Sequence, residues 1–203
     1  MKLSEKFGIV GMDDDRVRRS VFPTRVVLSR GNVTGQEYLK EFKPRQVAIY
    51  SYHDQCTLDN RESGINAAVL VDFGRELHGT LNISVWSMSS PHCEFRVRLG
   101  ESVSEALTPI GTKNATPDHA ERDTVFGAGP WSSNETCESG FRFAYIELTT
   151  PGVYAELRSV AAIMIYRDID YKGHFECSDP LIEKIYDTAA YTVHLNMQRY
   201  LWD

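Results

Sequence analysis

The sequence has no apolar run that approaches the roughly 18 residues a membrane-spanning helix needs, so no membrane segment is expected. Its first twenty residues also lack the apolar core and the small-residue cleavage site of a signal peptide. We therefore expect a soluble cytoplasmic protein, or a periplasmic or secreted one whose leader has been removed. The length of 203 residues suits one sizeable domain, or one domain and a fragment of another.

Clustered positive charge is absent too. The chain carries 22 basic and 28 acidic side chains, a formal net charge of -6, and no basic block. Proteins that bind nucleic acids neutralise phosphates with clustered lysine and arginine. Neither a nucleic acid nor a membrane is therefore expected as a partner.

Motifs for metals and common cofactors are missing. None of the six histidines lies in an H-E-x-x-H motif, and there is no P-loop, G-x-G-x-x-G or G-x-S-x-G. The triplet Asp13-Asp14-Asp15 lacks the spaced oxygens, the glycine and the glutamate of a calcium loop. The sequence thus indicates no metal site and no cofactor, although it leaves calcium binding open. Buried reduced thiols are expected for the four widely spaced cysteines, which are Cys56, Cys93, Cys137 and Cys177.

Short β-strand patterns fill the chain from about Val21 to Tyr171. Cys93–Leu99 alternates apolar and charged residues, which is typical of a half-buried strand. Phe141–Tyr145 begins in the same way and then slips phase, so a bulge or two-sided burial is expected near Tyr145. Val160–Tyr166 is apolar on both faces, which indicates a central or covered strand. Further candidate strands are Val26–Leu28, Val47–Tyr50, Ala67–Phe73 and Thr80–Val85, and Thr34–Leu39 is a candidate short helix.

Segments rich in glycine, proline, serine and asparagine separate these strands. The pattern predicts a mainly β fold, an antiparallel β-sandwich, rather than βαβ units. A polar arm, residues 1–20, is expected to precede the sandwich domain, residues 21–172.

A helix is predicted within residues 173–203. Ser178-Asp179-Pro180 supplies a capping residue followed by proline in the first turn. One apolar stripe follows at helical spacing, made of Ile182, Ile185, Tyr186, Ala189, Val193 and Met197. The sequence stops at Tyr200-Leu201-Trp202-Asp203 without a C-terminal glycine or a basic last turn. We therefore expect a chain cut from a longer protein.

One polar segment invites a functional interpretation. Asp72, Arg75, Glu76 and His78 lie around Gly74 and before Gly79, at the expected junction of two strands. They could form a polar site beside a tight turn. The favoured alternative is a turn with left-handed glycines in which the charges pair locally.

Pattern alone names no reaction. Glycoside hydrolysis needs two carboxyl groups across a sugar ring, but acidic residues are too numerous here for spacing to nominate a pair. The 11% aromatic content suits sugar stacking and a sandwich core equally, and a core is the preferred interpretation.

Six segments, however, form a recognisable series in chain order. They are VDFGRELHGTL at 71–81, GESVSE at 100–105, Asp123-Thr124, GFRFAYI at 140–146, GHFECSDPLIEKIY at 173–186 and NMQRYLWD at 196–203. Together they resemble bacterial α-L-rhamnosidases of the inverting glycoside hydrolase type. The resemblance covers most of residues 65–203 and depends on the order of the motifs.

This resemblance implies a concanavalin-like, jelly-roll sandwich, followed from residue 173 by the first helix of a catalytic (α/α)6 barrel. Members of the family hydrolyse terminal α-L-rhamnose in glycosides through a general acid and a general base. Asp203 matches the aspartate that contacts the sugar, whereas the catalytic acid and base lie beyond this sequence. The 203-residue chain is thus expected to hold no catalytic residue and to be inactive alone. The implied partners are a rhamnose-containing glycoside and the missing barrel, and the exposed helix could also pair with a second copy.

Two alternatives stay open. One is a free-standing carbohydrate-binding β-sandwich whose exposed aromatic side chains stack on sugar. The other is a purely structural or assembly domain, which dimerisation without sugar binding would favour.

Overall fold

The computed structural model describes residues 6, 15–43, 53–62, 64–112 and 122–198. The chain divides into two compact units. The larger is Arg18–Ile165, and the other comprises the terminal segments Met1–Val17 and Tyr166–Asp203. Each unit is described by itself.

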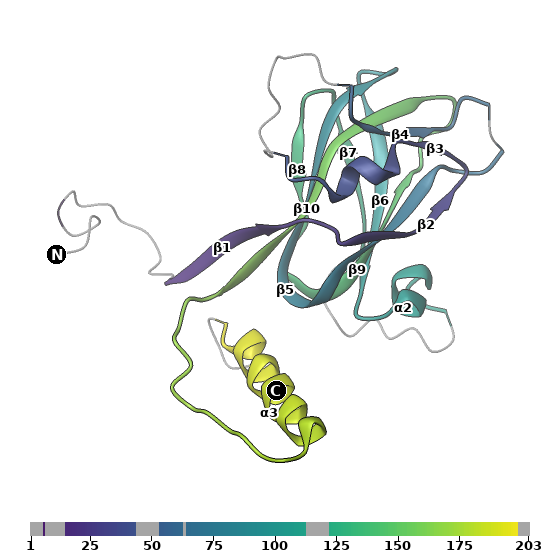
Figure 1. The fold of residues 1–203 in the computed structure, drawn as a ribbon. Helices are drawn as coiled ribbons and strands as arrows, with labels where there is room; N and C mark the ends of the chain where they lie inside the picture. The colour runs from purple at the N-terminus through teal and green to yellow at the C-terminus, as the bar shows by residue number, and fades with distance from the viewer. Residues whose placement is uncertain (1–5, 7–14, 44–52, 63, 113–121, 199–203) are drawn as a thin grey trace. The chain divides into compact units, whose positions relative to one another are not determined.

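The described chain is mainly β, as predicted, with an antiparallel sheet and a helix near its C-terminal end (Figure 1). The sheet order is β3-β4-β10-β5-β9-β6-β7, and β1, β2 and β8 pair with members of this path. The strands are β1 (Arg16–Val21), β2 (Arg25–Arg30), β3 (Asn32–Thr34), β4 (Cys56–Asp59), β5 (Ala68–Met88), β6 (Cys93–Gly100), β7 (Asp123–Ala128), β8 (Ser133–Glu135), β9 (Ser139–Leu148) and β10 (Tyr154–Arg167). The helices are η1 (Gln36–Lys40), a 3-10 turn, α2 (Val103–Leu107) and α3 (Pro180–Asn196).

Strand β5, 21 residues long, makes the sheet a sandwich. Its first part, Ala68–Asp72, lies between β2 and β9. Its last part, Gly79–Met88, pairs with β10, and Asn82–Ser84 pairs with β8 on the other edge. One layer is therefore β2-β5-β9-β6-β7, the other is β8-β5-β10-β4-β3, and β5 belongs to both.

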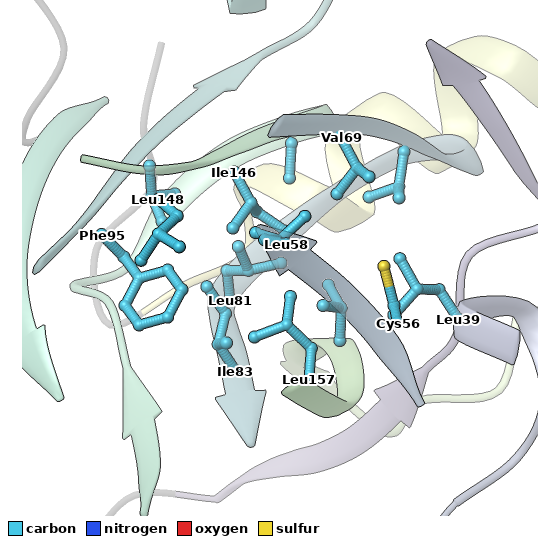
Figure 2. Close-up of a cluster of buried hydrophobic side chains, with 14 of the residues drawn as sticks. Leu39, Cys56, Leu58, Val69, Leu81, Ile83, Phe95, Ile146, Leu148 and Leu157 are labelled. Atoms are coloured by element: carbon cyan, nitrogen blue, oxygen red, sulfur yellow. The ribbon is translucent and has the colours of Figure 1, made fainter. Parts of the chain in front are cut away.

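The main core lies between these layers (Figure 2). Val69, Phe95 and Ile146 come from the first layer, and Ile83 and Leu157 come from the second; all are at most 1% exposed. Each such side chain stabilises the fold by about 1.5–3 kcal/mol relative to its exposed state.

A smaller cluster covers the outer face of the first layer. Ala106 of α2 packs there with Leu70 of β5 and with Phe143 and Tyr145 of β9. The side chain of Ser102 caps α2 by accepting a hydrogen bond from the backbone N–H of Glu105 at 3.2 Å.

The strand predictions hold for most segments. Cys93–Leu99 lies in β6, Thr80–Val85 lies in β5, and Val160–Tyr166 lies in β10, an interior strand of the sheet. The candidate short helix at Thr34–Leu39 overlaps η1, a 3-10 helix of five residues. Val47–Tyr50 lies outside the described residues.

The two-sided burial expected near Tyr145 is confirmed, because residues 143–146 of β9 are all buried, and the change of phase itself lies slightly earlier in the strand. Phe141 packs in the main core, whereas Phe143 and Tyr145 pack in the outer cluster. The slip therefore falls between Phe141 and Phe143. Its cause is in the partner strand, because β5 shifts register between Asp72 and Leu77.

Two predictions need correction or extension. None of the four cysteines, all of which lie in the described residues, forms a disulfide, but Cys137 is exposed and Cys177 is only half-buried, so the prediction of buried thiols is wrong for these two. Burial raises the pKa of the Cys56 thiol to about 12. In addition, Arg16–Val21, most of which falls in the segment expected to be a polar arm, forms strand β1.

The second unit contains the predicted helix. The side chain of Asp179 accepts a hydrogen bond from the backbone N–H of Leu181 at 2.9 Å, and Pro180 opens the first turn of α3. Near the other end, His194 Nε2 donates to the backbone oxygen of Arg167 at 2.7 Å and Nδ1 accepts from the Tyr171 hydroxyl at 2.8 Å. Among the described residues, no helix is long and apolar enough to cross a membrane.

Candidate functional site

The polar segment Asp72–Gly79 forms a bulge inside β5 rather than a turn between two strands. Asp72 lies opposite Phe143 and Leu77 lies opposite Phe141, so β5 holds three more residues than β9 over this stretch. Gly74 has a φ of +88°, a left-handed conformation that favours glycine. Its backbone N–H donates to Asp72 Oδ1 at 2.7 Å, which closes the start of the bulge.

Asp72 is the anchor of this bulge. Its side chain is 2% exposed, and Arg142 binds both of its oxygens, with Nε–Oδ1 at 2.8 Å and Nη2–Oδ2 at 3.0 Å. Arg25 adds an Nε–Oδ2 contact of 2.9 Å. Burial alone would raise the pKa of this carboxyl, but hydrogen bonds from Arg142, Gly74 and Arg25 outweigh burial and lower the pKa to about 2. Asp72 is therefore a fixed anion and a poor proton donor.

Glu76, at the end of the bulge, has the opposite character. Burial, and then the negative charges of Glu101 and Glu105, raise the pKa of its carboxyl to about 8, against a smaller lowering by Arg142. A Cβ built on Gly140 of β9 would lie 3.6 Å from Glu76 Oε1, which places this carboxyl beside that glycine. Glu76 is thus a carboxylic acid that keeps its proton at neutral pH.

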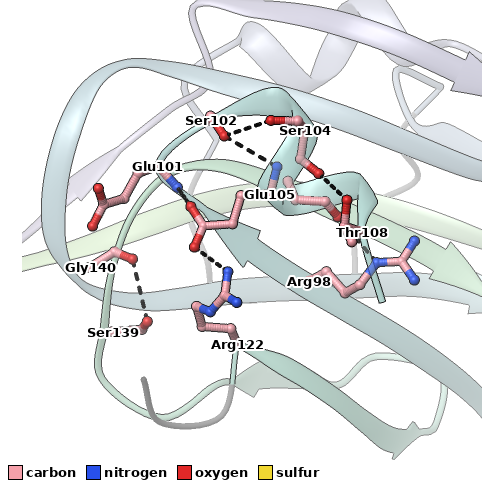
Figure 3. Close-up of polar contacts among 10 residues, drawn as sticks. Arg98, Glu101, Ser102, Ser104, Glu105, Thr108, Arg122, Ser139 and Gly140 are labelled. Atoms are coloured by element: carbon pink, nitrogen blue, oxygen red, sulfur yellow. Dashed lines mark hydrogen bonds and ion pairs between the residues drawn. The ribbon is translucent and has the colours of Figure 1, made fainter. Parts of the chain in front are cut away.

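Glu105 ties the start of α2 to the chain on both sides (Figure 3). Its Oε2 accepts a hydrogen bond from the backbone N–H of Glu101 at 2.8 Å, and its Oε1 pairs with Arg122, which is 5% exposed. The sequence contains the signal for this helix start, because Ser102-Val103-Ser104-Glu105 fits the capping-box pattern S-x-x-E. Sequence reasoning missed both the helix and the role of Glu105.

The expectation that charges in Asp72–Gly79 pair locally is wrong. Asp72 pairs with Arg25 and Arg142, which are 47 and 70 residues away, and His78 Nε2 lies 3.2 Å from Glu138 Oε2, 60 residues away. The prediction of left-handed glycines holds for Gly74. The segment is thus a junction between distant strands.

Metal-ligating side chains do not converge here. Within the described ranges, no group of three or more His, Cys, Asp or Glu side chains is arranged to hold a metal ion.

The second unit contains a cavity of about 1040 Å³ between the extended segment Ile169–Cys177 and α3. Rings of Phe175 and Tyr186 stack in its wall with centroids 5.3 Å apart. Glu183 accepts a hydrogen bond from the backbone N–H of Cys177 at 3.0 Å. Asp203, the residue matched to a sugar contact, lies outside the described residues.

Comparison with solved structures identifies proteins that share this fold. The chain is similar to a rhamnosidase from Klebsiella oxytoca with rhamnose bound (TM-score 0.63, 14% identity), over 93% of this chain and 37% of that one. It is also similar to a GH78 family rhamnosidase of Bacillus sp. GL1 (TM-score 0.58, 17% identity), over 81% and 17% of the two chains. A third likeness is to the α-L-rhamnosidase from Dictyoglumus thermophilum (TM-score 0.50, 23% identity), over 72% and 16%.

These likenesses show a shared fold over the regions covered. The chain spans between 16% and 37% of the length of these three proteins. No protein-family profile matches the sequence, and no curated protein is significantly similar to it.

Proposed function

We propose that this chain forms the accessory sandwich of an α-L-rhamnosidase, which releases terminal α-L-rhamnose from glycosides with inversion. The observation that carries the proposal is the likeness to a rhamnose-bound rhamnosidase over 93% of the chain. The order of the sequence motifs supports it independently. In this proposal the (α/α)6 barrel that bears the catalytic acid and base is a separate part of the enzyme, and Asp203 contacts the sugar.

The polar site is consistent with a supporting role. An inverting hydrolase needs one carboxyl group that gives a proton and another that activates water. Asp72 and Glu105 do not suit these tasks, because arginines and main-chain amides already hold them. The motif residues Asp72 and Gly74 instead shape the bulge of β5.

The surface of α3 supports a covering partner. No residue of this helix is buried, and Leu181, Ile182, Ile185 and Val193 are 47–63% exposed. Exposed apolar residues gathered on one helix mark an interaction surface. A catalytic barrel would cover this stripe.

The purified 203-residue chain should show no sustained turnover of an aryl α-L-rhamnoside. The physical reason is that inversion requires both carboxyl groups, which the proposal assigns to the barrel. Release of the aryl alcohol is measured by absorbance over hours, with a full-length rhamnosidase as the positive control. Steady turnover by the chain would refute the proposal. Saturable heat on calorimetric titration with rhamnose, without turnover, would favour the free-standing carbohydrate-binding module.

The isolated 203-residue chain should self-associate through the exposed apolar side chains of α3. Sedimentation velocity is expected to show a concentration-dependent increase in mass, which Ile182→Gln with Ile185→Gln reduces or abolishes. The matched control, Lys184→Gln with Asp187→Asn, changes exposed polar positions of the same helix and should leave association unchanged. A monomer at all concentrations would contradict the expectation.

A further inference from the structure

Arg98 of β6 is a buried cation on the outer face of the first layer. It is 8% exposed, and in the sheet register it lies opposite Tyr145 of β9 and Asp123 of β7. Its Nε donates a hydrogen bond to the backbone oxygen of Ala106 in α2 at 3.1 Å, and its guanidinium carbon lies 4.5 Å from the centre of the Tyr145 ring. These contacts fix the position of the guanidinium group without supplying a negative charge.

The carboxylates around Arg98 are bound to other groups. Asp123 gives both of its oxygens to Arg96, with Nε–Oδ1 and Nη2–Oδ2 both at 2.7 Å. Glu105 of α2 is held by a different arginine and by a main-chain amide. Glu147 of β9 accepts a hydrogen bond from a side-chain amide at 2.8 Å. In the part of the chain that the structure describes, no salt bridge reaches Arg98.

The two terminal nitrogens of Arg98 have no acceptor among the described residues. The hydrogen bond to Ala106 uses Nε alone. Figure 3 shows the terminal nitrogens pointing away from Glu105 and from Arg122. A guanidinium group is always charged and carries five N–H donors, and burial of a charge without a partner is costly. The open end of the guanidinium fork matches a carboxylate, which it can bind through two parallel hydrogen bonds.

The Tyr145 hydroxyl is a second buried group without a partner. Tyr145 is 1% exposed, and none of the described residues forms a hydrogen bond with its hydroxyl. Arg30, exposed at the end of β2, lies on the same face of the sheet, opposite Ala68 of β5. Burial and the charge of Glu147 raise the pKa of the hydroxyl, against a lowering by Arg30 and Arg98. The hydroxyl therefore keeps its proton at neutral pH and can donate it to an acceptor.

We propose that Arg98 and the Tyr145 hydroxyl form a binding site for the carboxylate of a small anionic ligand. The guanidinium fork supplies the positive charge and two N–H donors, and the hydroxyl supplies a third hydrogen bond from the neighbouring strand. The fork and the tyrosine ring are in contact, so one carboxylate can reach both groups. The exposed Arg30 adds positive charge on the same face. This site is independent of the rhamnosidase proposal, because it uses only groups on the outer face of the first layer.

Nuclear magnetic resonance of the 203-residue chain, with sodium glucuronate as the probe, tests the site. At pH 7, glucuronate should cause saturable shifts in the Arg98 Nε–H signal and in the Ala106 amide signal. Glucose, which has a similar ring and no charge, should cause none. Sodium chloride at equal ionic strength controls for screening and should also cause none. The absence of saturation with glucuronate, or equal saturation with glucose or chloride, would overturn the proposal.

Tyr145→Phe separates binding from folding. The substitution removes only the hydroxyl and keeps the ring beside Arg98. Without ligand, the variant should unfold at the same urea concentration as the wild type or at a higher one, because it loses a buried group that has no partner. Its affinity for glucuronate should fall by about tenfold or more, as expected for the loss of a hydrogen bond to a charged group. Lower stability with unchanged affinity would show that the hydroxyl is purely structural and would overturn the site.

Arg98→Lys keeps the positive charge and removes the fork, so the affinity for glucuronate should also fall by about tenfold or more. If this variant does not fold, the Tyr145→Phe titration decides. Arg61→Gln is the matched control: Arg61 also stacks on a tyrosine, Tyr154, at 4.7 Å, but Asp59 already occupies its fork. This control should bind glucuronate as the wild type does. An equal loss of affinity in the control, or an unchanged affinity in folded Arg98→Lys, would overturn the site.

Discussion

Replacing Asp72 by asparagine should destabilise the sandwich by about 2–3 kcal/mol at neutral pH. The substitution leaves two arginines and the Gly74 amide facing a neutral side chain that is 2% exposed in the wild type. Breaking one side of a buried ion pair costs about 3–5 kcal/mol, and partial exposure of Arg25 and Arg142 reduces that figure. Urea denaturation of both chains gives the difference in the free energy of unfolding.

The Asp72 effect has a defined pH dependence. Because the folded-state pKa is lowered to about 2 from 3.8, the ionised carboxylate contributes stability above pH 3.8 that is lost as pH falls through about 2. The difference in the free energy of unfolding between the wild type and Asp72→Asn should therefore decrease below pH 4. Asp59→Asn is the matched control, since Asp59 pairs with Arg61, which is two residues away and has a half-exposed side chain. Loss of this ion pair should lower the free energy of unfolding by less than about 1 kcal/mol. Equal effects at the two positions would contradict the anchoring role of Asp72.

Replacing Gly79 by alanine should cost more than about 3 kcal/mol or prevent folding. Gly79 pairs with Met164 of β10 and with Ser139 of β9. A Cβ at this position would lie 2.0 Å from the backbone oxygen of Ile163 and 2.8 Å from its carbonyl carbon. Backbone atoms cannot rotate out of the way, so this clash is relieved only if β5 moves away from β10. Such a displacement, like the overpacking of a core, lowers the free energy of unfolding substantially.

Thermal or urea unfolding followed by circular dichroism measures the loss at Gly79. Gly129→Ala serves as the control, because its Cβ would meet only the backbone oxygen of Pro91 at 3.5 Å. A Gly79→Ala chain with wild-type stability would show that the strands approach less closely than described.

The spacing of apolar residues along the sequence predicts those strands and helices that bury one regular face. The alternation in Cys93–Leu99 predicts β6, and the apolar stripe after Asp179 predicts α3. Both signals, the spacing of apolar residues and the helix cap, depend only on residues that are close in sequence. The capping box at Ser102 was available to the same reasoning and predicts α2. Strand β1 is harder to predict, since Arg16–Val21 shows no alternation of apolar residues.

The polar site could not be assembled from the sequence. Asp72 stands in a noticeable motif, but its arginine partners lie 47 and 70 residues away, and nothing in their spacing indicates a pairing. The raised pKa of Glu76 depends on burial beside β9 and on the negative charges of Glu101, which precedes α2, and Glu105, which lies within it. These are consequences of tertiary contact, so residue type and spacing do not reveal them.

Strand β5 links the two layers of the sandwich covalently, because it is a member of both. The same backbone pairs with β2 and β9 in the first layer and with β10 in the second, so loss of β5 from one layer also removes a hydrogen-bonded strand from the other. Heat or denaturant should then dismantle residues 18–165 in a single cooperative step. For the same reason, half of this sandwich could not be exchanged with a homologous half by recombination without rebuilding its central strand.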